Sequence, residues 1–274
     1  MNTPPRMFDP GLDETPSPAR MYDYFLGGHH NFPADRAAAE QVIALAPDAP
    51  LVAQANRAFL RRAVNVLAAR GVAQFLDLGS GIPTVGNVHD IAQQANPDAR
   101  VVYVDIDPVA VTHSAALLVD TPTATVIQAD ARRPEQILAH AETRRLLDLR
   151  QPVAVLLVAM LHFVPDDADA ERMVRALRDA LAPGSYIVIS HAISDALDTT
   201  APDEALEGSQ DVYDRSTNPF KLRSRAQVSQ FFTGLELIEP GLVDTPLWRP
   251  EEQDDLFLHE PARAFSVVGV GRKR

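Results

Sequence analysis

Short β-rich runs alternate with helix-like stretches from residue 74 to residue 190, and this alternation limits the fold more than any other feature of the sequence. Each run consists mostly of Val, Ile, Leu or aromatic residues, and its length suits a strand buried on both faces. Such an order is typical of βαβ units, in which parallel strands form one sheet that helices cover on both sides. The predicted strands span residues 74–78, 100–106, 125–129, 153–158 and 186–190.

The segments between these runs have recognisable helix boundaries. Asp107 is a residue type that caps a helix N-terminus, and Pro108 and Pro134 suit a first turn, where no backbone N–H is needed. Pro183 and Gly184 end the last of these helices. The predicted helices span residues 85–95, 108–119, 134–147 and 169–181.

After residue 190 the pattern loosens into a polar, irregular region. One helix is predicted at 202–213, and another begins at Ser224, which has capping-box spacing to Gln227. Two late strands, 235–239 and 264–271, lack a full crossover helix between them. We therefore expect them to form an antiparallel hairpin at the sheet edge. The link between these two strands is long and polar and contains Trp248.

Helical segments precede the alternating pattern. The chain is proline-rich up to about Pro18 and is expected to be loosely held there, whereas residues 35–46 and 50–70 have helical patterns. The predicted fold is α/β: a doubly wound, mostly parallel sheet of seven strands with an antiparallel edge strand, plus an N-terminal helical extension. We expect residues 1–70 to form this extension and residues 71–274 the main domain, with an irregular lid at about 191–223.

The charge of the chain argues against nucleic acid as a partner. Its 274 residues include 25 basic and 37 acidic side chains, a net charge of −12, whereas nucleic-acid affinity depends on Lys and Arg neutralising phosphates. Lys221, Arg223 and Arg225 form a short basic cluster, which we expect to be a solvated surface. The sequence contains no cysteine, so disulfides, thiolate metal sites and a cysteine nucleophile are excluded.

No membrane segment or metal motif is predicted. The longest apolar run near the middle, Val153 to Leu161, is about half of the roughly 20 residues that cross a bilayer, and the N-terminus lacks the apolar core of a secretory signal. We therefore expect a cytoplasmic protein. His29 and His30 are adjacent and have no HxxxH or HExxH partner, so no metal site is predicted.

The segment FLDLGSGIPT, residues 75–84, carries the clearest chemical signal. A strand ends near Asp77, and the turn Gly79-Ser80-Gly81 allows the backbone to approach a ligand at the strand's carboxyl end. Asp105 ends the next predicted strand, where an acid accepts hydrogen bonds from the ribose of an adenosine-containing ligand.

Which adenosine cofactor binds depends on the rest of this loop. Thr84 stands where the dinucleotide fingerprint has a third small residue, and the sequence contains no GK[ST] phosphate loop, which weakens an NAD-dependent oxidoreductase as an alternative. Asp130 ends the third strand, so acids recur at three strand ends. Acidic side chains at three strand ends are compatible with S-adenosylmethionine, which carries an amino group, a ribose diol, an adenine and a positive sulfonium.

The segment RMYDYFLGGHHNFP, residues 20–33, shows no clean helix or strand period. Tyr22 and Tyr24 are either core aromatics or part of a loop that covers the cofactor. The adjacent Gly27 and Gly28 favour the loop, because glycines permit close backbone approach.

From DLGSG through YVDIDP, QADARRP and LLVAMLHFVPD, the chain resembles the class I S-adenosylmethionine-dependent methyltransferases, which have a Rossmann-like fold. PARMYDYFLGGHHNFPADRAAAE followed by FLDLGSGIPT resembles, more narrowly, a bacterial S-adenosyl methyltransferase family once catalogued as a domain of unknown function. This resemblance covers nearly the whole chain. It departs from the family at positions 29 and 30, where GGHHNF replaces the usual GGKDNF.

The resemblance implies which residues bind the cofactor. The matching positions are Asp77, Gly79, Ser80 and Gly81 for its methionine part, Asp105 for the ribose, Ile106, Asp130 and Ala131 for the adenine, and Ala159, Met160 and His162 beside the sulfonium. We further expect the opening segment to fold back over the strand ends. Its enclosing residues are then Arg20, Tyr24, Gly28 and Asn31, with Arg20 pairing with the cofactor's carboxylate.

The expected function is transfer of a methyl group to a small molecule, with S-adenosylhomocysteine as the second product. Such transfer needs alignment of the two reactants more than a universal base, so the catalytic residues are left unassigned, with His162 and His191 as candidates. The acidic surface favours a neutral or cationic acceptor. The alternative is a cofactor-binding regulatory or partner protein without transfer activity. The sequence does not fix the oligomeric state.

Overall fold

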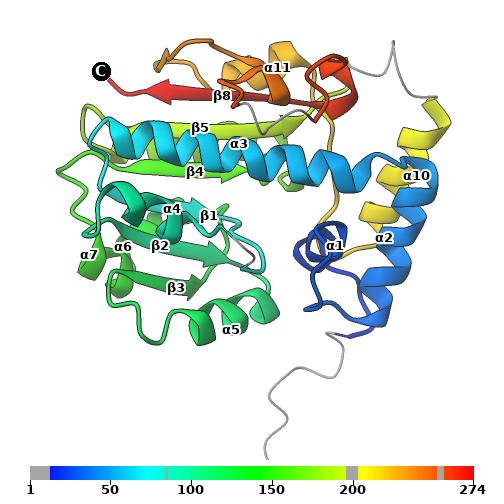
Figure 1. Cartoon of the computed structure of the whole chain (residues 1–274), viewed down its shortest axis with the longest axis horizontal. Helices are drawn as coiled ribbons and strands as arrows, with labels where there is room; N and C mark the ends of the chain where they lie inside the picture. Colours follow the sequence, from blue (N-terminus) through cyan, green and yellow to red (C-terminus); the bar gives the residue numbers. More distant parts are fainter. Residues whose placement is uncertain (1–12, 84–85, 196–202, 252–255) are drawn as a thin grey trace, which may run out of the picture.

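A mixed sheet of eight strands forms the centre of the described structure (Figure 1). The computed structural model describes residues 13–83, 86–195, 203–251 and 256–274, with the side chains of 203–207 excepted. Thr84, Val85, Pro202 and the first 12 residues, about which the sequence made predictions, lie outside these ranges. The strand order is β3-β2-β1-β4-β5-β8-β6, and β7 also pairs with β8.

The five predicted parallel strands are confirmed. They are β1 (Gln74–Leu78), β2 (Arg100–Asp105), β3 (Ala124–Gln128), β4 (Ala154–Val158) and β5 (Tyr186–Ala192). Because they run in parallel, their carboxyl ends lie along one edge, and the arrows in Figure 1 point to the same side.

The two predicted late strands are also present, and a third accompanies them. β8 (Ser266–Arg272) runs antiparallel to β5, and β6 (Glu236–Leu237) and β7 (Val243–Asp244) pair antiparallel with β8. β6 is shorter than predicted, ending before Pro240, which has no N–H to donate to a ladder. β8 lies between β5 and β6, as an antiparallel insertion near the edge.

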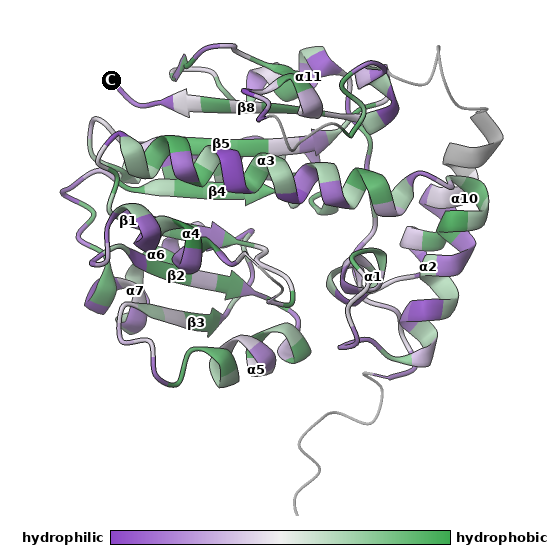
Figure 2. Cartoon of the chain, viewed as in Figure 1, coloured by the Kyte–Doolittle hydropathy of each residue, from purple (hydrophilic) through white to green (hydrophobic). Residues whose placement is uncertain are grey.

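Helices cover both faces of the sheet, as expected for a doubly wound fold. On one face, α3 (Ala49–Ala69) and α4 (Val88–Ala95) pack in a cluster that contains Phe75 of β1. On the other, the cluster that contains Leu76 is covered by α6 (Pro134–Ala139), α7 (Ala141–Leu146), α8 (Asp167–Ala180) and α11 (Arg225–Gln230). Successive strand residues thus point to opposite faces, and β4 and β5 are apolar along most of their length (Figure 2). Helix α5 (Pro108–Leu117) lies against β2 and β3.

Two helix predictions are corrected by the structure. The helix predicted at 134–147 is two helices, because His140 has an extended backbone (ψ 140°) and its ring accepts a hydrogen bond from Glu142 N at the start of α7. The opening segment contains a helix, α1 (Pro18–Phe25), where no period was recognised. α1 has only two turns, and within residues 20–33 Met21 and Phe25 are its one buried apolar pair at helical spacing. One pair is too few to establish a period.

A further, smaller core lies beyond the carboxyl ends of the strands. Four helices contribute to it: α1, α2 (Pro33–Leu45), α10 (Asp203–Asp214) and the first turns of α3. The contributing side chains include Met21 and Phe25 of α1, Val42 of α2, Ala53 of α3 and Val212 of α10. In Figure 1, α1, α2 and α10 stand past the tips of the parallel strands. The predicted helix near 202–213 thus packs with the N-terminal helices, although about 160 residues separate them in sequence.

None of the helices within the described ranges has both the length and the apolar character that crossing a bilayer requires. The described part of the chain also contains three short 3₁₀ turns, η1 (Leu161–Phe163), η2 (Thr245–Leu247) and η3 (Pro261–Ala264).

Trp248, in the link predicted to be polar, is fully buried and packs edge to face on Phe59 of α3, with ring centroids 5.4 Å apart. Replacing Trp248 with Ala is expected to lower the free energy of unfolding by about 3–5 kcal/mol, because the lost ring leaves a cavity. The neighbouring Leu247, 40% exposed, is the matched control, and Leu247→Ala should change stability by no more than about 0.5 kcal/mol. Urea denaturation followed by circular dichroism measures both; a loss at Trp248 below about 1 kcal/mol contradicts its role as an anchor.

Candidate functional site

One cavity of about 460 Å³ opens at the carboxyl edge of the parallel strands. Its size falls in the range of small-molecule sites, roughly 300–1,000 Å³. The loops after β1 to β4 and the end of β5 contribute to its wall, and so do α1, α2, α3, α10 and the segment before α11. Two parts of the wall differ in character. The acidic end comprises Asp77, Gly79, Ser80, Gly81, Asp105, Ile106, Asp130 and Ala131, and the aromatic end comprises Tyr22, His162, Phe163, Tyr213, Asn218 and Phe220.

The turn after β1 requires its glycines. Gly79 and Gly81 have φ of 71° and 66°, in the left-handed region that side chains disfavour. A Cβ on Gly79 would lie 2.7 Å from Met160 Cγ, whereas one on Gly81 would meet nothing within 4 Å. The Gly81 N–H donates to Asp105 Oδ2 at 2.7 Å, so the turn after β1 is tied to the end of β2.

Asp77 and Asp105 are both 6% exposed, at the ends of neighbouring strands. Burial raises the pKa of Asp77 to about 7, although the positive charge of Arg57 opposes the shift. Burial also raises the pKa of Asp105 to about 6, against hydrogen bonds from the backbone N–H groups of Asp107 and Gly81. A cationic group beside them would favour their ionised forms, so this end suits a ligand with a positive charge.

The adenine positions divide into two kinds. Ile106 and Ala131 place apolar side chains at the wall, and Ile106 is 44% exposed. Asp130 also lines the cavity, but Arg132 binds both of its carboxylate oxygens, at 2.9 and 2.7 Å, and holds the pKa of Asp130 below its usual value. Part of its hydrogen-bonding capacity is therefore already used.

The end of β4 carries an unusual backbone conformation. Ala159 has φ of 54°, rare for a residue with a Cβ, and its N–H donates to Ser190 Oγ at 2.7 Å. Ala159, Met160 and His162 all line the cavity, as the sequence resemblance implied.

His191 lines the cavity but has no nitrogen free for catalysis. Arg223 Nη1 donates to its Nε2 at 3.0 Å, which leaves the proton on Nδ1, 2.6 Å from the carbonyl oxygen of Ala192. Burial lowers the pKa of His191 to about 4, so the ring is neutral. Its surroundings therefore argue against a role as general base.

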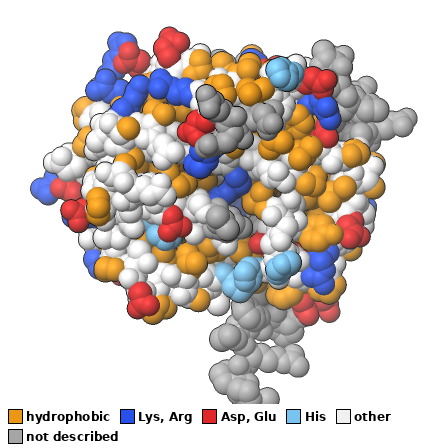
Figure 3. All heavy atoms as spheres, in the orientation of Figure 1, with side chains coloured by type: hydrophobic (Ala, Val, Ile, Leu, Met, Phe, Trp, Pro, Cys, Tyr) orange, Lys and Arg blue, Asp and Glu red, His pale blue; other side chains and the backbone are white. Residues whose placement is uncertain are grey.

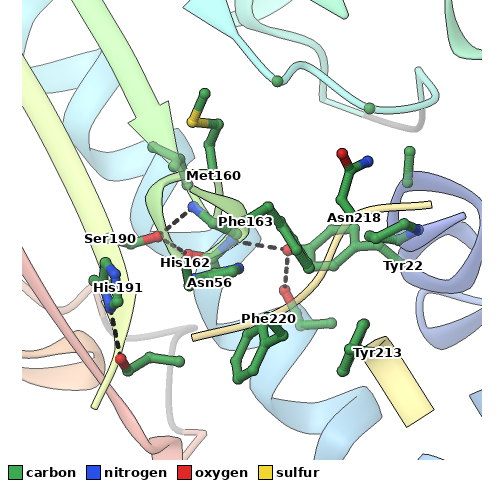
Figure 4. A pocket seen from close by; sticks show the side chains of 18 of the residues that line it. Tyr22, Asn56, Met160, His162, Phe163, Ser190, His191, Tyr213, Asn218 and Phe220 are labelled. Carbon is green, nitrogen blue, oxygen red and sulfur yellow. Dashed lines mark hydrogen bonds between the residues drawn. The ribbon is translucent and has the colours of Figure 1, made fainter. Parts of the chain in front are cut away.

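His162 differs from His191 because its Nδ1 is buried and has no hydrogen-bond partner in the described part of the chain. Burial first, and then the nearby His191 and Arg223, lower its pKa well below the usual range. The ring is held among Phe163 and Phe220, with centroids 4.5 and 4.9 Å away (Figure 4).

Four predicted cofactor residues of the opening segment, Arg20, Tyr24, Gly28 and Asn31, do not line the cavity. Arg20 is buried, binds Asp35 and the carbonyl of Thr15, and lies over the Phe32 ring. Asn31 binds Asp23 and the carbonyl of Gly28, and the Tyr24 hydroxyl donates to Glu40 at the surface. These contacts fold the segment locally. Its cavity-lining members are instead Tyr22 and Phe25, and Ser17, Pro18 and Ala19, just before the segment, also line the cavity.

The adjacent His29 and His30 side chains do not contact the same group. The His30 ring lies 4.0 Å from that of His113, and His29 is exposed. Among the residues that the structure describes, no three His, Asp or Glu side chains are grouped so that they would hold a metal ion.

The basic cluster 221–225 is more than a solvated surface, contrary to the sequence prediction. Arg223 is 1% exposed and donates to the carbonyl oxygens of Leu161 and Val164, at 3.0 and 2.7 Å. It thus brackets the turn η1 that carries His162. In the sequence this residue stands out only by its charge, and nothing there indicates that its partners are carbonyl groups.

Four other cavity residues were also not assigned from the sequence, namely Asn56, Ser190, Tyr213 and Phe220. Asn56 is a polar residue on a buried helix face, which is a usable signal. Tyr213 and Phe220 come from the irregular region, where no periodicity indicates which side chains face inward.

The residues at the acidic end fit S-adenosylmethionine. Ser80 Oγ is buried without a partner in the described ranges, Gly81 leaves room for close approach, and two desolvated carboxyl groups are available for a cation. These features match an amino acid moiety and a ribose.

Comparisons with known proteins point the same way. A family model described as S-adenosyl methyltransferase matches residues 9–274. A crystal structure from Thermobifida fusca, which carries a provisional methyltransferase name, is 44% identical with a TM-score of 0.88 and covers 97% of this chain and 98% of that chain. A DUF574 family protein from Streptomyces avermitilis is 38% identical, with a TM-score of 0.89 and coverage of 96% and 99%.

A third structure, a Bordetella parapertussis protein provisionally named as exported, is similar in fold alone. It is 20% identical, with a TM-score of 0.54 over 93% of this chain and 77% of that chain. No curated protein sequence matches this chain.

The raised pKa values predict how ligand binding depends on pH. Asp77 must lose its proton, with a pKa of about 7, to pair with an ammonium group. The affinity for S-adenosylmethionine should therefore rise between about pH 5 and pH 7, by up to about tenfold per unit, while the ligand's α-amino group stays charged. Asp77→Asn should weaken binding by about 10- to 100-fold and flatten this dependence, since a charge-assisted hydrogen bond is lost. Isothermal titration calorimetry at several pH values measures both effects.

The exposed Asp120→Asn is the matched control and should bind like the parent protein. The same raised pKa values also make the stability of the fold depend on pH. The folded protein holds these protons more tightly than the unfolded chain, so this contribution to the free energy of unfolding falls as pH rises from about 4 to 7. An affinity that does not change with pH in the parent protein would contradict the assignment of Asp77.

Proposed function

Because this chain belongs to the S-adenosyl methyltransferase family, we propose that it transfers a methyl group to a small-molecule acceptor held in the cavity described above. The family match and the two close structures confirm the resemblance, the α/β fold and the cofactor predicted from the sequence, so the protein is an S-adenosylmethionine-dependent methyltransferase. The identity of the acceptor and the roles of individual residues belong to the proposal.

A single observation supports a small acceptor most strongly. The acidic end and the aromatic end border the same cavity, whose wall is completed by side chains of α1, α3 and α10. A cavity of about 460 Å³ suits small ligands and not a folded macromolecule. We therefore assign the acidic end to the methyl donor and the aromatic end to the acceptor.

When bound, S-adenosylmethionine supplies a methyl group on a positively charged sulfur, which makes the leaving group good without further activation. The protein's own task is alignment. Asp77 and the Gly79–Gly81 backbone orient the amino acid part, and Asp105 holds the ribose. The N-terminal helices and α10, packed together at the strand ends, exclude water from the space between the reactants.

The charge of the molecule favours an acceptor that is not a polyanion. The net charge is −12, and on the face drawn in Figure 3 Lys and Arg side chains stand among acidic and uncharged ones, with no basic field that spans the face.

Radiolabelled methyl transfer tests this proposal directly. The protein is incubated with S-adenosylmethionine labelled in its methyl group and with three fractions of a bacterial extract: small molecules, nucleic acid and protein. We expect label in the small-molecule fraction, together with formation of S-adenosylhomocysteine. Asp105→Asn should reduce transfer by about 10- to 100-fold, because a hydrogen-bonded carboxylate at the ribose is lost, and Asp120→Asn should not.

Label in nucleic acid or protein would contradict a small acceptor. Tight cofactor binding without transfer to any fraction would favour the regulatory alternative, and tighter binding of NAD than of S-adenosylmethionine would contradict the cofactor assignment.

A further inference from the structure

The aromatic end of the cavity is built from three separate segments of the chain. Phe163 comes from the turn after β4, Tyr213 from α10, and Phe220 from the segment before α11. The Tyr213 and Phe220 rings stack with centroids 5.0 Å apart and planes at 25°, and Phe163 lies 5.7 Å from each (Figure 4). All three side chains are partly exposed, so ring surface is available to an occupant of the cavity.

Such a wall selects for flat, apolar ligands. Aromatic pairs gain about 0.5–1.5 kcal/mol beyond their buried area when their geometry is favourable. None of the six residues at this end carries a fixed charge, and burial keeps the His162 ring neutral. Since an unpaired charge would lose its hydration here, a neutral ligand is favoured.

A buried chain of hydrogen bonds fixes the polar groups on the adjoining wall. Ala159 N donates to Ser190 Oγ at 2.7 Å, and Ser190 Oγ lies 2.6 Å from Asn56 Oδ1. The Ala159 N–H can only donate, so the hydroxyl proton of Ser190 must go to Asn56 Oδ1. This determines the orientation of the Asn56 amide.

The series of hydrogen bonds continues from the nitrogen of the Asn56 amide. Asn56 Nδ2 donates to Tyr22 Oη at 2.9 Å, and the Tyr22 hydroxyl donates to the carbonyl of Ala53 at 3.0 Å. The amide of Asn56 has two protons and Tyr22 takes one. One N–H of this cavity-lining side chain is therefore available to a ligand, and the Tyr22 proton is not.

A second polar atom without a hydrogen-bond partner within the described residues is Nδ1 of His162, a buried side chain that lines the cavity. A hydroxyl group is the smallest neutral group that both accepts from an amide N–H and donates to a neutral imidazole nitrogen. An aromatic amine accepts poorly, because its lone pair is delocalised into the ring.

We propose that the methyl acceptor is a neutral, planar aromatic compound with a ring hydroxyl, whose ring packs on Phe163, Tyr213 and Phe220 and whose oxygen is recognised by Asn56 and His162. This inference rests on the proposed function and names its substrate class.

The chemical step balances within this site. A lone pair of the hydroxyl oxygen forms the new O–C bond as the S–C bond breaks, and the electrons of that bond remain on sulfur. The hydroxyl proton passes to His162 and then to water. A neutral imidazole with a lowered pKa suffices, because a hydroxyl oxygen that has gained a methyl group is strongly acidic.

A matched ligand series tests the substrate class. The probes are 2-naphthol, naphthalene, 2-naphthylamine, 2-naphthoate and decahydro-2-naphthol, supplemented by one- and three-ring phenols. Their affinity for the protein saturated with S-adenosylhomocysteine is measured by calorimetry, and methyl ether formation with S-adenosylmethionine by mass spectrometry. We expect the phenols to bind at least about tenfold more tightly than the saturated and the ionised probes, and to be methylated on oxygen.

Two variants separate ring stacking from hydroxyl recognition. Phe220→Leu keeps an apolar side chain but removes the ring, and should weaken phenol binding by about 2- to 10-fold without affecting decahydro-2-naphthol. Asn56→Leu removes the N–H donors at nearly constant size and puts no acceptor in their place. It should reduce the preference for 2-naphthol over naphthalene, while His162 still accepts the hydroxyl proton. Tyr24→Phe, on the same helix as Tyr22 but outside the cavity, is the control and should change neither. All variants must still bind S-adenosylhomocysteine as the parent protein does.

The inference is wrong if no phenol is preferred over its saturated and ionised counterparts, or if the labelled product of the extract experiment is aliphatic or charged. In both cases methyl transfer to a small molecule would still stand. Failure to transfer methyl to any small molecule would remove the proposed function as well.

Discussion

The parallel pairing of β1 with β2 on one side and β4 on the other is the constraint on which the site depends. It brings the ends of three strands to one edge, and there it buries Asp77 and Asp105, each 6% exposed, with Gly81 N bound to Asp105. Burial raises the pKa values of these two carboxyl groups to about 7 and 6. Keeping them ionised at neutral pH therefore costs free energy when no ligand is bound. The arrangement is explained by a cationic ligand, whose charge replaces the lost hydration.

The helices at the strand ends convert this edge into an enclosed site. α1, α2 and α10 share a small apolar core that is separate from the two clusters on the faces of the sheet. The hydrogen-bond chain from Tyr22 through Asn56 and Ser190 ties this cover to Ala159, whose positive φ requires support from its surroundings. Arg223 holds the adjoining turn through the carbonyl groups of Leu161 and Val164. We infer that donor and acceptor are aligned by connections between segments distant in sequence, and not by one catalytic residue.

Local chemistry explains which parts of the structure were predictable. Strand β1 was predicted to the residue and the Asp107 cap was confirmed, because apolar runs, capping types and turn glycines act over a few positions. The acidic end follows from the same local rules, since Asp77 and Asp105 sit where strands end. Arg223 was misjudged and the burial of Trp248 was not predicted, because both depend on partners elsewhere, the carbonyls after β4 and Phe59 of α3. Arg20 was expected at the cofactor, and the sequence did not indicate that its guanidinium binds Asp35, 15 positions on, and the carbonyl of Thr15. At the aromatic end His162 was predicted, but the three stacked rings were not, since Phe163, Tyr213 and Phe220 meet only through tertiary folding.

The central claim is that one cavity holds the methyl donor at its acidic end and directs the sulfur toward the aromatic end. A crystal structure with S-adenosylhomocysteine bound tests this most directly. The account predicts the amino group within hydrogen-bonding distance of Asp77 or of a water bound to it, the ribose hydroxyls on Asp105, and the sulfur facing the space beside Met160, His162 and Phe163. A cofactor whose adenine lies among Phe163, Tyr213 and Phe220, or whose sulfur points away from these rings, would contradict it.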